Sequence, residues 1–438
     1  MNVNKIELSD LTEEQSMGIQ MIQRFLSEPV IQNDLNSKVF VIQGQAGTGK
    51  TTMLKLALQD IISNESHLSF ESINNVYEAD LFTNGALGCV GVTVAHKAKK
   101  VLNRSIPICT TYASYFGLIV NIDDYGNKKF IPNPNKKTQN NALFRKTQKV
   151  VVHDEVSMYD LDMINHILSS TPFDTKVILV GDPGQLPPIN ENEEFPTDED
   201  SPAFTIFQNK IILRKKVRQT EGNPIIELTD FIYEKIFTVN GVTQNELNEV
   251  LNLMSIPKFN EGIGYEMVKF KEFLPIYTSL TKDFMDSKII AYRNDNVNFY
   301  NNLIRNYVRN NPSEKIIPGE LIYMNDTFSI DQKTKFYNSD EYIISAENKL
   351  SHEGVECHQA FVDGSLHDHL NTSQNTYMLI PTHEGQKELD RLMVYYNRCI
   401  SETKYGTMER NIAYSKKFKF LEKFANISYG YCYTSHKS

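Results

Sequence analysis

The hydrophobic pattern of the first half of the chain predicts strands that alternate with helices. Apolar runs at residues 39–42, 91–94, 150–152 and 177–180 have the length of buried strands. The run at 39–42 leads through a glycine-rich turn into MLKLALQDII, which has helical spacing. Because strands that alternate with helices form a parallel sheet with helices on both faces, this pattern predicts a doubly wound α/β domain.

The pattern changes after residue 117. Residues 118–132 contain two short apolar stretches around a Tyr-Gly-Asn turn, which predicts a β-hairpin inserted at 117–148. Residues 191–202 are acidic and contain proline, as is typical of a solvated loop at a domain boundary. New strand and helix patterns then begin with KIILRKKVRQ and with DSKIIAYRNDNVNFYNN. Residues 319–363 are rich in strand patterns, and residues 384–424 have a helical pattern.

Composition narrows the class of protein without assigning a function. The 438 residues leave room for two to four domains of about 100–200 residues each. Lys plus Arg number 45 and Asp plus Glu 54, so the formal net charge is −9 and any contact with a polyanion must be local. The five cysteines are far apart, which favours free thiols in a reducing compartment over structural zinc.

The sequence predicts neither a membrane span nor an N-terminal signal peptide. No apolar run reaches the ~18 residues that a membrane span requires, and the N-terminus lacks the apolar core of a signal peptide. We therefore expect a soluble cytoplasmic protein, in the host cytoplasm if a phage encodes it.

A phosphate-binding loop is the sharpest motif. Residues 44–51 fit GxxxxGK[ST] between a strand and a helix. Their backbone N–H groups and the helix N-terminus would hold phosphates, Lys50 would contact the β- and γ-phosphates, and Thr51 would ligate Mg²⁺. The alternative is a glycine-rich turn that only permits close packing. The predicted nucleotide-binding residues are Gly44, Gln45, Ala46, Gly47, Thr48, Gly49, Lys50, Thr51 and Thr52.

Two further groups of polar residues follow predicted strands. Asp154 and Glu155 come after the strand at 150–152, where a second magnesium ligand and a base for the attacking water would lie. The alternative is a pair of solvated carboxylates, and we assign His153 no role. Asp182 and Gln185 lie in GDPGQLPP after the strand at 177–180. They can report on a γ-phosphate, or the segment can be a simple Pro/Gly turn.

Together these motifs resemble superfamily 1 helicases of the RecD/Dda-like 5′–3′ branch, especially the Dda-like helicases of large tailed phages. LTEEQ, GQAGTGKTT, TVAHKAKKVL, HDEVSMYD, VGDPGQLPPI, LRKKVRQTEGNPI and YGYCYTSHKS occur in the order of the family's motifs. The resemblance implies two RecA-like P-loop NTPase domains, a β-hairpin pin at 117–148 and an SH3-like β-rich insertion. It places the first domain at 1–190, the first part of the second at 203–318, the SH3-like and helical insertion at 319–424, and an incomplete return at 425–438.

The resemblance also implies roles for residues at the nucleotide. Gln15 matches the glutamine that recognises adenine, so ATP with Mg²⁺ is the expected nucleotide substrate. Thr51 and Asp154 match the metal ligands, and Glu155 matches the base. Gln185 matches the γ-phosphate sensor, and Arg218 matches an arginine that the second RecA-like domain supplies.

On the DNA side, the resemblance points to Thr93, His96 and Lys97, with Lys99 and Lys100 nearby. Relatives carry Thr-x-His in the next motif, whereas this chain has Thr111-Tyr112-Ala113, so only Thr111 is retained as a contact. Phe130, or otherwise Tyr125, is the candidate for stacking on the last base pair. Without the family, each of these residues would be read as a solvated or packing residue. Thr434 and His436 complete the expected DNA contacts.

The expected function is an ATP-dependent helicase that moves 5′–3′ on single-stranded DNA and opens duplexes as the cleft between its RecA-like domains closes and opens. Two alternatives remain open: a DNA-stimulated translocase without unwinding, and an inactive remnant that binds ATP or DNA. The family continues past the motif at which this chain stops, so we expect a truncated or split polypeptide. Expected partners are single-stranded and forked DNA and a single-stranded-DNA-binding or other replication protein, with the chain itself a monomer.

Overall fold

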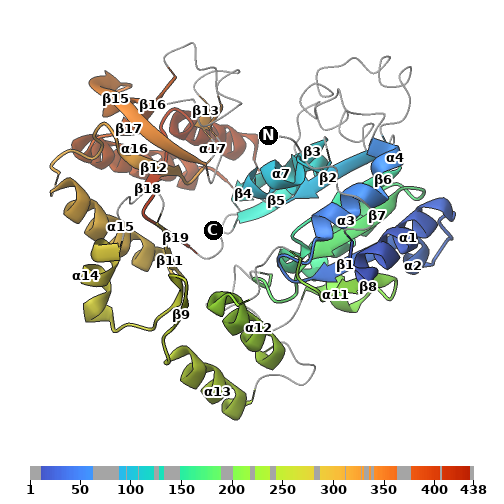
Figure 1. The fold of residues 1–438 in the computed structure, drawn as a ribbon. Coiled ribbons are helices and arrows are strands. Elements are labelled where there is room, and N and C mark those ends of the chain that lie inside the picture. Colours follow the sequence, from blue (N-terminus) through green and yellow to red (C-terminus); the bar gives the residue numbers. More distant parts are fainter. Residues whose placement is uncertain are drawn as a thin grey trace. The chain divides into compact units, whose positions relative to one another are not determined.

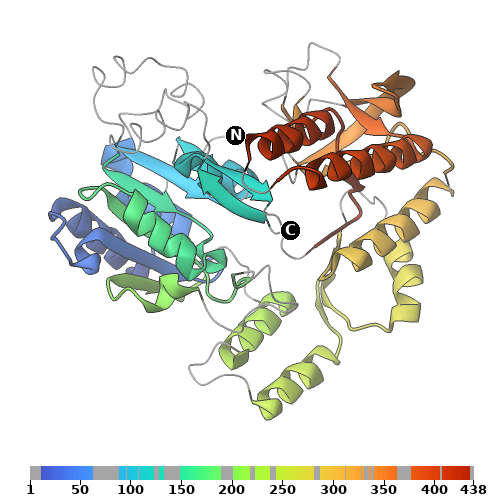
Figure 2. The same cartoon turned by 180° about the vertical axis from the view of Figure 1, so that it is seen from behind.

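The structure is a computed structural model. It describes residues 11–62, 88–94, 96–106, 108–122, 128–132, 148–188, 201–217, 222–236, 243–280, 287–310, 312–326, 328–329, 335–336, 340–362, 376–404 and 407–434 (Figures 1 and 2). The chain divides into two compact units, Met1–Lys269 and Phe270–Ser438. Each unit is described by itself.

The first unit is built on a parallel six-stranded sheet of the RecA-like kind. The strand order is β3-β2-β6-β7-β1-β8, and every neighbouring pair is parallel. The four strands predicted from the apolar runs are confirmed. The strands are β1 (Val39–Gly44), β2 (Cys89–Thr93), β3 (Cys109–Thr111), β6 (Val150–His153), β7 (Lys176–Gly181) and β8 (Lys210–Leu213).

Helices cover both faces of this sheet because its central strands are apolar on both sides. In β1, Phe40 and Ile42 pack on the face covered by α1 (Glu13–Ser27), α3 (Lys50–Ala57) and α7 (His96–Leu102). Val39 and Val41 pack on the opposite face, against α8 (Tyr112–Phe116), α10 (Leu161–Ser170) and α11 (Pro202–Thr205). The short helices α2 (Leu35–Lys38) and α4 (Gln59–Ile62) flank β1 and α3. The carboxyl ends of all six strands lie at one edge of the sheet.

A hairpin follows α8, as the sequence predicts. Gly117, at φ 65°, ends α8, and β4 (Leu118–Ile122) pairs antiparallel with β5 (Lys128–Pro132). In this register Val120 lies opposite Phe130. The turn between the strands, including Tyr125, is outside the described residues. The assignment of the hairpin as a duplex-splitting pin remains a prediction.

The predicted start of a second domain at residue 203 is wrong. Strand β8 pairs parallel with β1, from Val41 opposite Lys210 to Gly44 opposite Leu213, so it is an edge strand of the first sheet. A polar loop before a strand looks the same within a domain as between domains, which is why the sequence misplaces the boundary. The first unit continues with α12 (Pro224–Ile236), α13 (Gln244–Met254) and a hairpin of β9 (Lys258–Asn260) and β10 (Ile263–Tyr265).

The second unit combines a small α/β part with an antiparallel sheet. The α/β part contains α14 (Phe270–Leu280), β11 (Ile289–Ala291), α15 (Asn294–Arg309) and β19 (Cys432–Thr434), with β11 and β19 parallel. The antiparallel sheet has the order β17-β16-β15-β12-β18. Its strands are β12 (Leu321–Met324), β15 (Glu341–His352), β16 (Val355–Val362), β17 (Tyr377–Pro381) and β18 (Ile427–Tyr429), accompanied by the two-residue strands β13 (Phe328–Ser329) and β14 (Lys335–Phe336).

Two long helices, α16 (His383–Ser401) and α17 (Met408–Leu421), confirm the helical pattern predicted there and pack beside this sheet (Figure 1). The predicted end of the insertion at residue 424 is too early. Strand β18 pairs with β12 from Ile322 opposite Tyr429 to Met324 opposite Ile427, so the antiparallel sheet extends to Tyr429. Its assignment as SH3-like remains a prediction.

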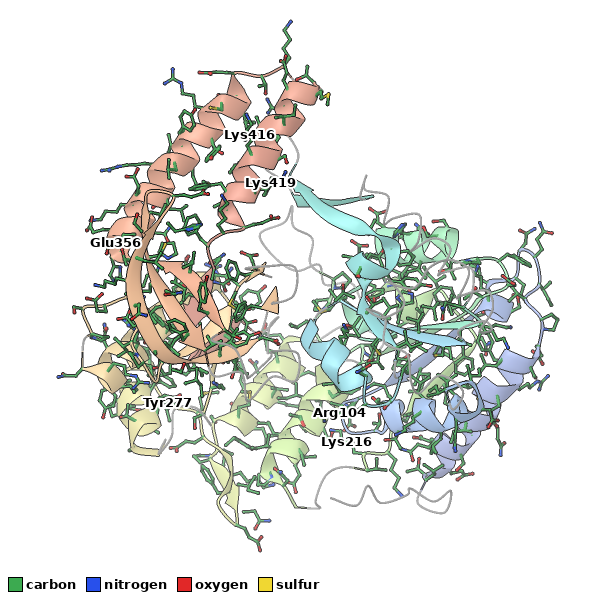
Figure 3. The ribbon with its side chains drawn as sticks, turned by 90° about the horizontal axis from the view of Figure 1, so that it is seen from above. Arg104, Lys216, Tyr277, Glu356, Lys416 and Lys419 are labelled. Carbon is green, nitrogen blue, oxygen red and sulfur yellow. The ribbon has the colours of Figure 1, made fainter. Side chains whose placement is uncertain are left out.

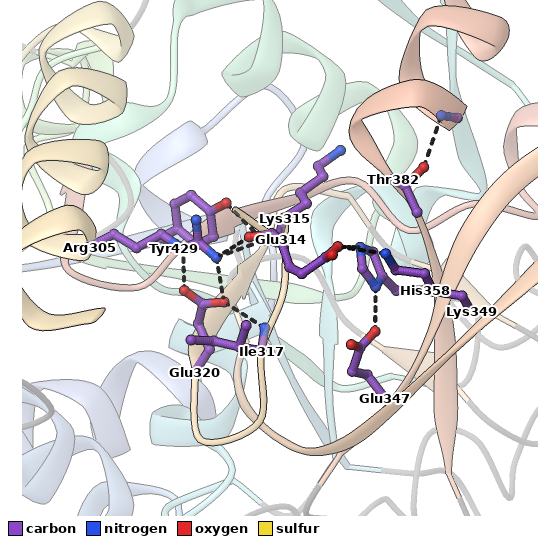
Figure 4. Close-up of polar contacts among 11 residues, drawn as sticks. Arg305, Glu314, Lys315, Ile317, Glu320, Glu347, Lys349, His358, Thr382 and Tyr429 are labelled. Atoms are coloured by element: carbon purple, nitrogen blue, oxygen red, sulfur yellow. Dashed lines mark hydrogen bonds and ion pairs between the residues drawn. The ribbon is translucent and has the colours of Figure 1, made fainter. Parts of the chain in front are cut away.

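A buried ion pair ties the α/β part to the antiparallel sheet. Arg305 of α15 bonds to the carboxylate of Glu320, just before β12, through both Nε and Nη2 (Figure 4). Nη2 also donates to the carbonyl oxygens of Glu314 and Lys315, at 2.8 and 3.2 Å. The guanidinium lies 4.4 Å from the ring centroid of Tyr429 in β18. One side chain thus connects α15, the loop before β12 and β18.

Among the helices that the structure describes, none combines the length and the apolar character needed to cross a bilayer.

Candidate nucleotide-binding site

The predicted phosphate loop joins β1 to α3 in a conformation that requires glycine. Gly47 and Gly49 have φ values of 84° and 80°, a region that other L-residues rarely adopt. A Cβ atom on Gly44 would lie 2.7 Å from the carbonyl oxygen of Leu213. Gly49 is the N-cap of α3, so the loop leads directly into the positive end of a helix. Backbone and helix therefore fit a phosphate group, as the motif predicts.

Gln15 holds this loop from the side. Its Nε2 donates to the carbonyl oxygen of Thr48 at 2.9 Å, and its Oε1 accepts the N–H of Thr12 at 2.9 Å in a capping box. A Cβ atom on Gly49 would lie 2.3 Å from that Nε2. Gln15 is buried. The sequence predicted Gln15 at the nucleotide but not this contact, which anchors α1 to the loop.

Lys50 begins α3 and lies among carboxylates. Its Nζ donates to the carbonyl oxygens of Gly44 at 2.6 Å and Gln45 at 3.1 Å. Burial lowers the pKa of this lysine, and the carboxylates of Asp182, Asp154 and Glu155 oppose that shift. The ammonium is thus the positive centre of the site. Thr51 and Thr52 follow it in the first turn of α3 and are partly buried.

Asp154 and Glu155 form a tight turn at the carboxyl end of β6. Glu155 has φ 59°, a strained value for a residue other than glycine that costs about 1–3 kcal/mol. Its N–H donates to Oδ1 of Asp154 at 3.0 Å. Burial raises the pKa of Asp154, whereas the hydrogen bond from the Glu155 N–H and the charge of Lys50 lower it by a smaller amount. Burial and the charge of Asp154 raise the pKa of Glu155 to about 7, although the charge of Lys50 lowers it in part. Strain and perturbed pKa values together are typical of a functional site.

Asp182 connects the phosphate loop to the turn after β7. Its carboxylate accepts the N–H of Ala46 at 3.0 Å and the N–H of Gly184 at 2.9 Å. Gln185, in the same turn, is exposed. The same carboxylate therefore bonds to both the phosphate loop and the turn after β7, so a movement of either one would act on it.

Two residues that shape the site, Glu14 and Val217, were not predicted from the sequence. The carboxylate of Glu14 in α1 accepts the N–H groups of Arg214 and Lys215, at 2.7 and 3.2 Å. The N–H of Val217 donates to the carbonyl oxygen of Gly47 at 2.9 Å. The chain that leaves β8 is therefore held against the phosphate loop. Lys216 in this segment, labelled in Figure 3, forms an ion pair with Asp230 of α12. Arg218 itself is outside the described residues, but its preceding neighbours belong to the first unit, whereas the sequence assigned it to the second domain.

The predicted DNA contacts fall in separate places. Thr93 and Thr111 are register partners at the ends of β2 and β3, at the same edge as the phosphate loop. Both are buried, and Thr111 caps α8 by accepting the N–H of Ser114. His96 and Lys97 lie in α7 and Phe130 in β5, but their side chains are outside the described part of the chain.

Thr434 ends β19 in the second unit. It lines a pocket of about 260 Å³ together with Asn294, Asn298 and Asn325. His436 is outside the described residues.

The donors for a metal ion are few. Thr51 and Asp154 are the predicted ligands, and the described residues contain no cluster of three or more His, Cys, Asp or Glu side chains arranged around a possible ion. This donor set fits Mg²⁺, which keeps several waters and is bound through one or two protein oxygens plus substrate phosphates.

Comparison with known proteins agrees with the site. An AAA domain family matches residues 27–191, which include the phosphate loop, Asp154 and Asp182. The ATP-dependent DNA helicase dda of Enterobacteria phage T4 is 25% identical over 340 residues, which are 74% of this chain and 64% of that protein. The chain is similar to Dda-like superfamily 1 helicases.

Other matches cover more of the chain. An uncharacterised protein of Acanthamoeba polyphaga mimivirus is 23% identical over 464 residues, which are 93% of this chain and 88% of that protein. Among solved structures, the Pif1 helicase from Bacteroides in complex with ADP-AlF3 and ssDNA has 18% identity and a TM-score of 0.46. That match covers 85% of this chain and 74% of the other.

Proposed function

We propose that the chain is an ATP-dependent DNA helicase that moves 5′–3′ along single-stranded DNA and separates duplexes. The observation that carries this proposal is the position of Lys50 among Asp154, Glu155 and Asp182, at a glycine loop that leads into helix α3. Similarity to the phage helicase supports DNA as the partner, although this chain spans only 64% of that protein.

Nucleotide binding would use groups that already converge. Backbone N–H groups of residues 45–49 and the N-terminus of α3 would receive the phosphates, and the Lys50 ammonium would move from the carbonyls of Gly44 and Gln45 to phosphate oxygens. Gln15 supports the loop through Thr48 and is proposed to contact the adenine. ATP is therefore the proposed nucleotide.

Hydrolysis would depend on the Asp154–Glu155 turn. Thr51 and Asp154 are the proposed ligands of Mg²⁺, which when bound neutralises developing phosphate charge. Glu155 would orient the attacking water and accept its proton. Its pKa of about 7 leaves it substantially ionised near neutral pH. Gln185 and Arg218 are proposed to contact the γ-phosphate.

DNA would be held at the edge of the first sheet and in the second unit. His96, Lys97, Thr111 and Thr434 are proposed phosphate contacts, together with His436, and Phe130 is proposed to stack on the end of the duplex. The complete burial of Thr93 is evidence against direct contact through its side chain. Forked DNA and a single-stranded-DNA-binding protein are the proposed partners, with the chain acting as a monomer.

The test is ATP hydrolysis by the purified chain with and without oligo-dT, compared with Lys50→Ala and Glu155→Gln. We expect turnover that DNA stimulates and that both variants lose by at least 100-fold. Strand displacement is then measured on forks with a 5′ or a 3′ loading tail, and product is expected only with the 5′ tail. Turnover without product would replace the helicase proposal with a translocase. Turnover unaffected by Lys50→Ala would overturn the proposed site.

A further inference from the structure

The side chain of His153 is buried at the base of the Asp154–Glu155 turn, among aromatic rings. It is fully buried, and burial lowers its pKa to about 3, so it is a neutral ring near pH 7. Four aromatic rings surround it: Tyr112, Tyr115, Phe116 and Tyr159, with centroids 5.8 to 6.5 Å from its own. Its neighbours in β6 are valines, and a valine would fill a buried strand position equally well.

His153 and Tyr159 close the turn that carries the two carboxylates. The five residues between them include Asp154, Glu155 and the 3₁₀ turn η2 (Val156–Met158). The two rings meet edge to face at 5.8 Å, and the Tyr159 hydroxyl lies 3.4 Å from Nδ1 of His153. Glu155 has left-handed backbone angles inside this closed turn. Strained angles persist only where the surroundings hold them, and this ring contact is one of the surrounding constraints.

Tyr112 of helix α8 contacts both His153 and Tyr159. Tyr112 contacts Tyr159 at 5.7 Å and His153 at 6.5 Å, so it touches both ends of the turn. It directly follows Thr111, a proposed DNA contact and the N-cap of α8. At the other end of α8, Gly117 leads into the β4–β5 hairpin. A displacement of Thr111 or of the hairpin by DNA would therefore move the ring that packs on both ends of the turn.

We propose that His153 is a positioning residue, which holds the Asp154–Glu155 turn through its ring contact with Tyr159 and connects it through Tyr112 to helix α8 and bound DNA. This inference rests on the proposed ATPase function. It assigns no chemistry to His153, because the ring acts through the carboxylates that follow it.

The experiment measures kcat and KM for ATP, with and without saturating oligo-dT, in the full chain. His153→Val removes the ring and His153→Phe keeps one of similar size. Tyr112→Leu breaks the link to α8 but leaves the contact between His153 and Tyr159. Ile167→Ala, a buried position of α10 in the same core cluster, is the control for loss of packing alone, and melting temperatures are measured for all variants.

We expect His153→Val to lower kcat at least tenfold with KM changed less than twofold, and His153→Phe to restore kcat to within threefold of the original chain. Tyr112→Leu is expected to reduce the stimulation by DNA to near unity. The proposal is overturned if Phe is as harmful as Val, if Ile167→Ala loses kcat equally, or if Tyr112→Leu keeps the full stimulation. An original chain without Lys50-dependent turnover would instead show that the proposed function is wrong, and this inference with it.

Discussion

The side-chain amide of Gln15 donates to the carbonyl oxygen of Thr48 at 2.9 Å and so fastens helix α1 to the phosphate loop. The other amide atom, Oε1, is held by the N–H of Thr12, which fixes the orientation of the amide. The two bonds together fix the position of the Gln15 amide against the loop.

Gln15→Ala should weaken ATP binding more than it slows hydrolysis. The variant loses the partly buried bond with the Thr12 N–H and the buried bond to Thr48. The bond to the loop is worth about 1 kcal/mol, which corresponds to a roughly five- to tenfold rise in KM. Steady-state kinetics with ATP and GTP would check this, and discrimination between the two should fall. Gln20→Ala, an exposed glutamine of the same helix, is the matched control. An unchanged KM in Gln15→Ala would contradict the role of the contact.

Gly49→Ala should abolish nucleotide binding. The new methyl group would lie 2.3 Å from Nε2 of Gln15, at a residue with φ 80°. Gly354→Ala is the control for the effect of backbone strain alone. Gly354 has a similar φ of 84°, but no atom lies within 4 Å of the added methyl group, so no steric clash is expected. We expect that control to cost about 1 kcal/mol of stability and to bind nucleotide normally. Binding of a fluorescent ATP analogue and urea unfolding measure the two effects.

Removal of either partner of the Arg305–Glu320 pair should strongly destabilise the second unit. Both side chains are buried, so Arg305→Met or Glu320→Leu alone leaves an uncompensated charge and should cost about 3–5 kcal/mol. The double variant should be more stable than either single variant. Hydrogen exchange of α15 and β12 would report the loss in this unit specifically.

The exposed pair Lys387–Glu384 is the control for that experiment, and its removal should have a much smaller effect. Single variants of Arg305 and Glu320 as stable as the original chain would show that the pair is dispensable.

Phe130→Ala should separate unwinding from hydrolysis. If Phe130 stacks on the end of the duplex, its loss removes about 1–3 kcal/mol of stacking per base and should reduce strand displacement at least tenfold, with ATP turnover preserved. Phe259→Ala is a matched control, since Phe259 is an exposed aromatic residue in the β9–β10 hairpin. Equal effects of the two variants on displacement would contradict a special role for Phe130.

The parts of the site that follow local sequence rules could be predicted. The phosphate loop, Asp154, Glu155 and Asp182 each follow an apolar strand, and parallel strands bring their carboxyl ends to one edge. The membership of β8 could not be predicted, because the alternation of strands and helices is the same before and after residues 191–202. Pairing with β1 depends on which edge is available, and that is a tertiary property.

Contacts between side chains far apart in the chain could not be predicted from the sequence either. Glu14 lies 200 positions from Arg214, and nothing in LTEEQ distinguishes it from a solvated helix residue. Tyr112, His153 and Tyr159 come from three elements, and only the packed sheet shows that their rings meet. The sequence assigned His153 no role for this reason.

The pairing of β11 with β19 has a consequence for biosynthesis. Lys288, just before β11, bonds to Gly430, 142 positions later, and the entire antiparallel sheet lies between them in the chain. At about 5–20 residues per second a ribosome needs roughly 7–30 s to make that interval. All six strands of the first sheet are complete by Leu213, so the first unit can fold while the second is still being translated. During that interval β11 lacks its partner strand, so its backbone edge on that side is left unpaired in the nascent chain.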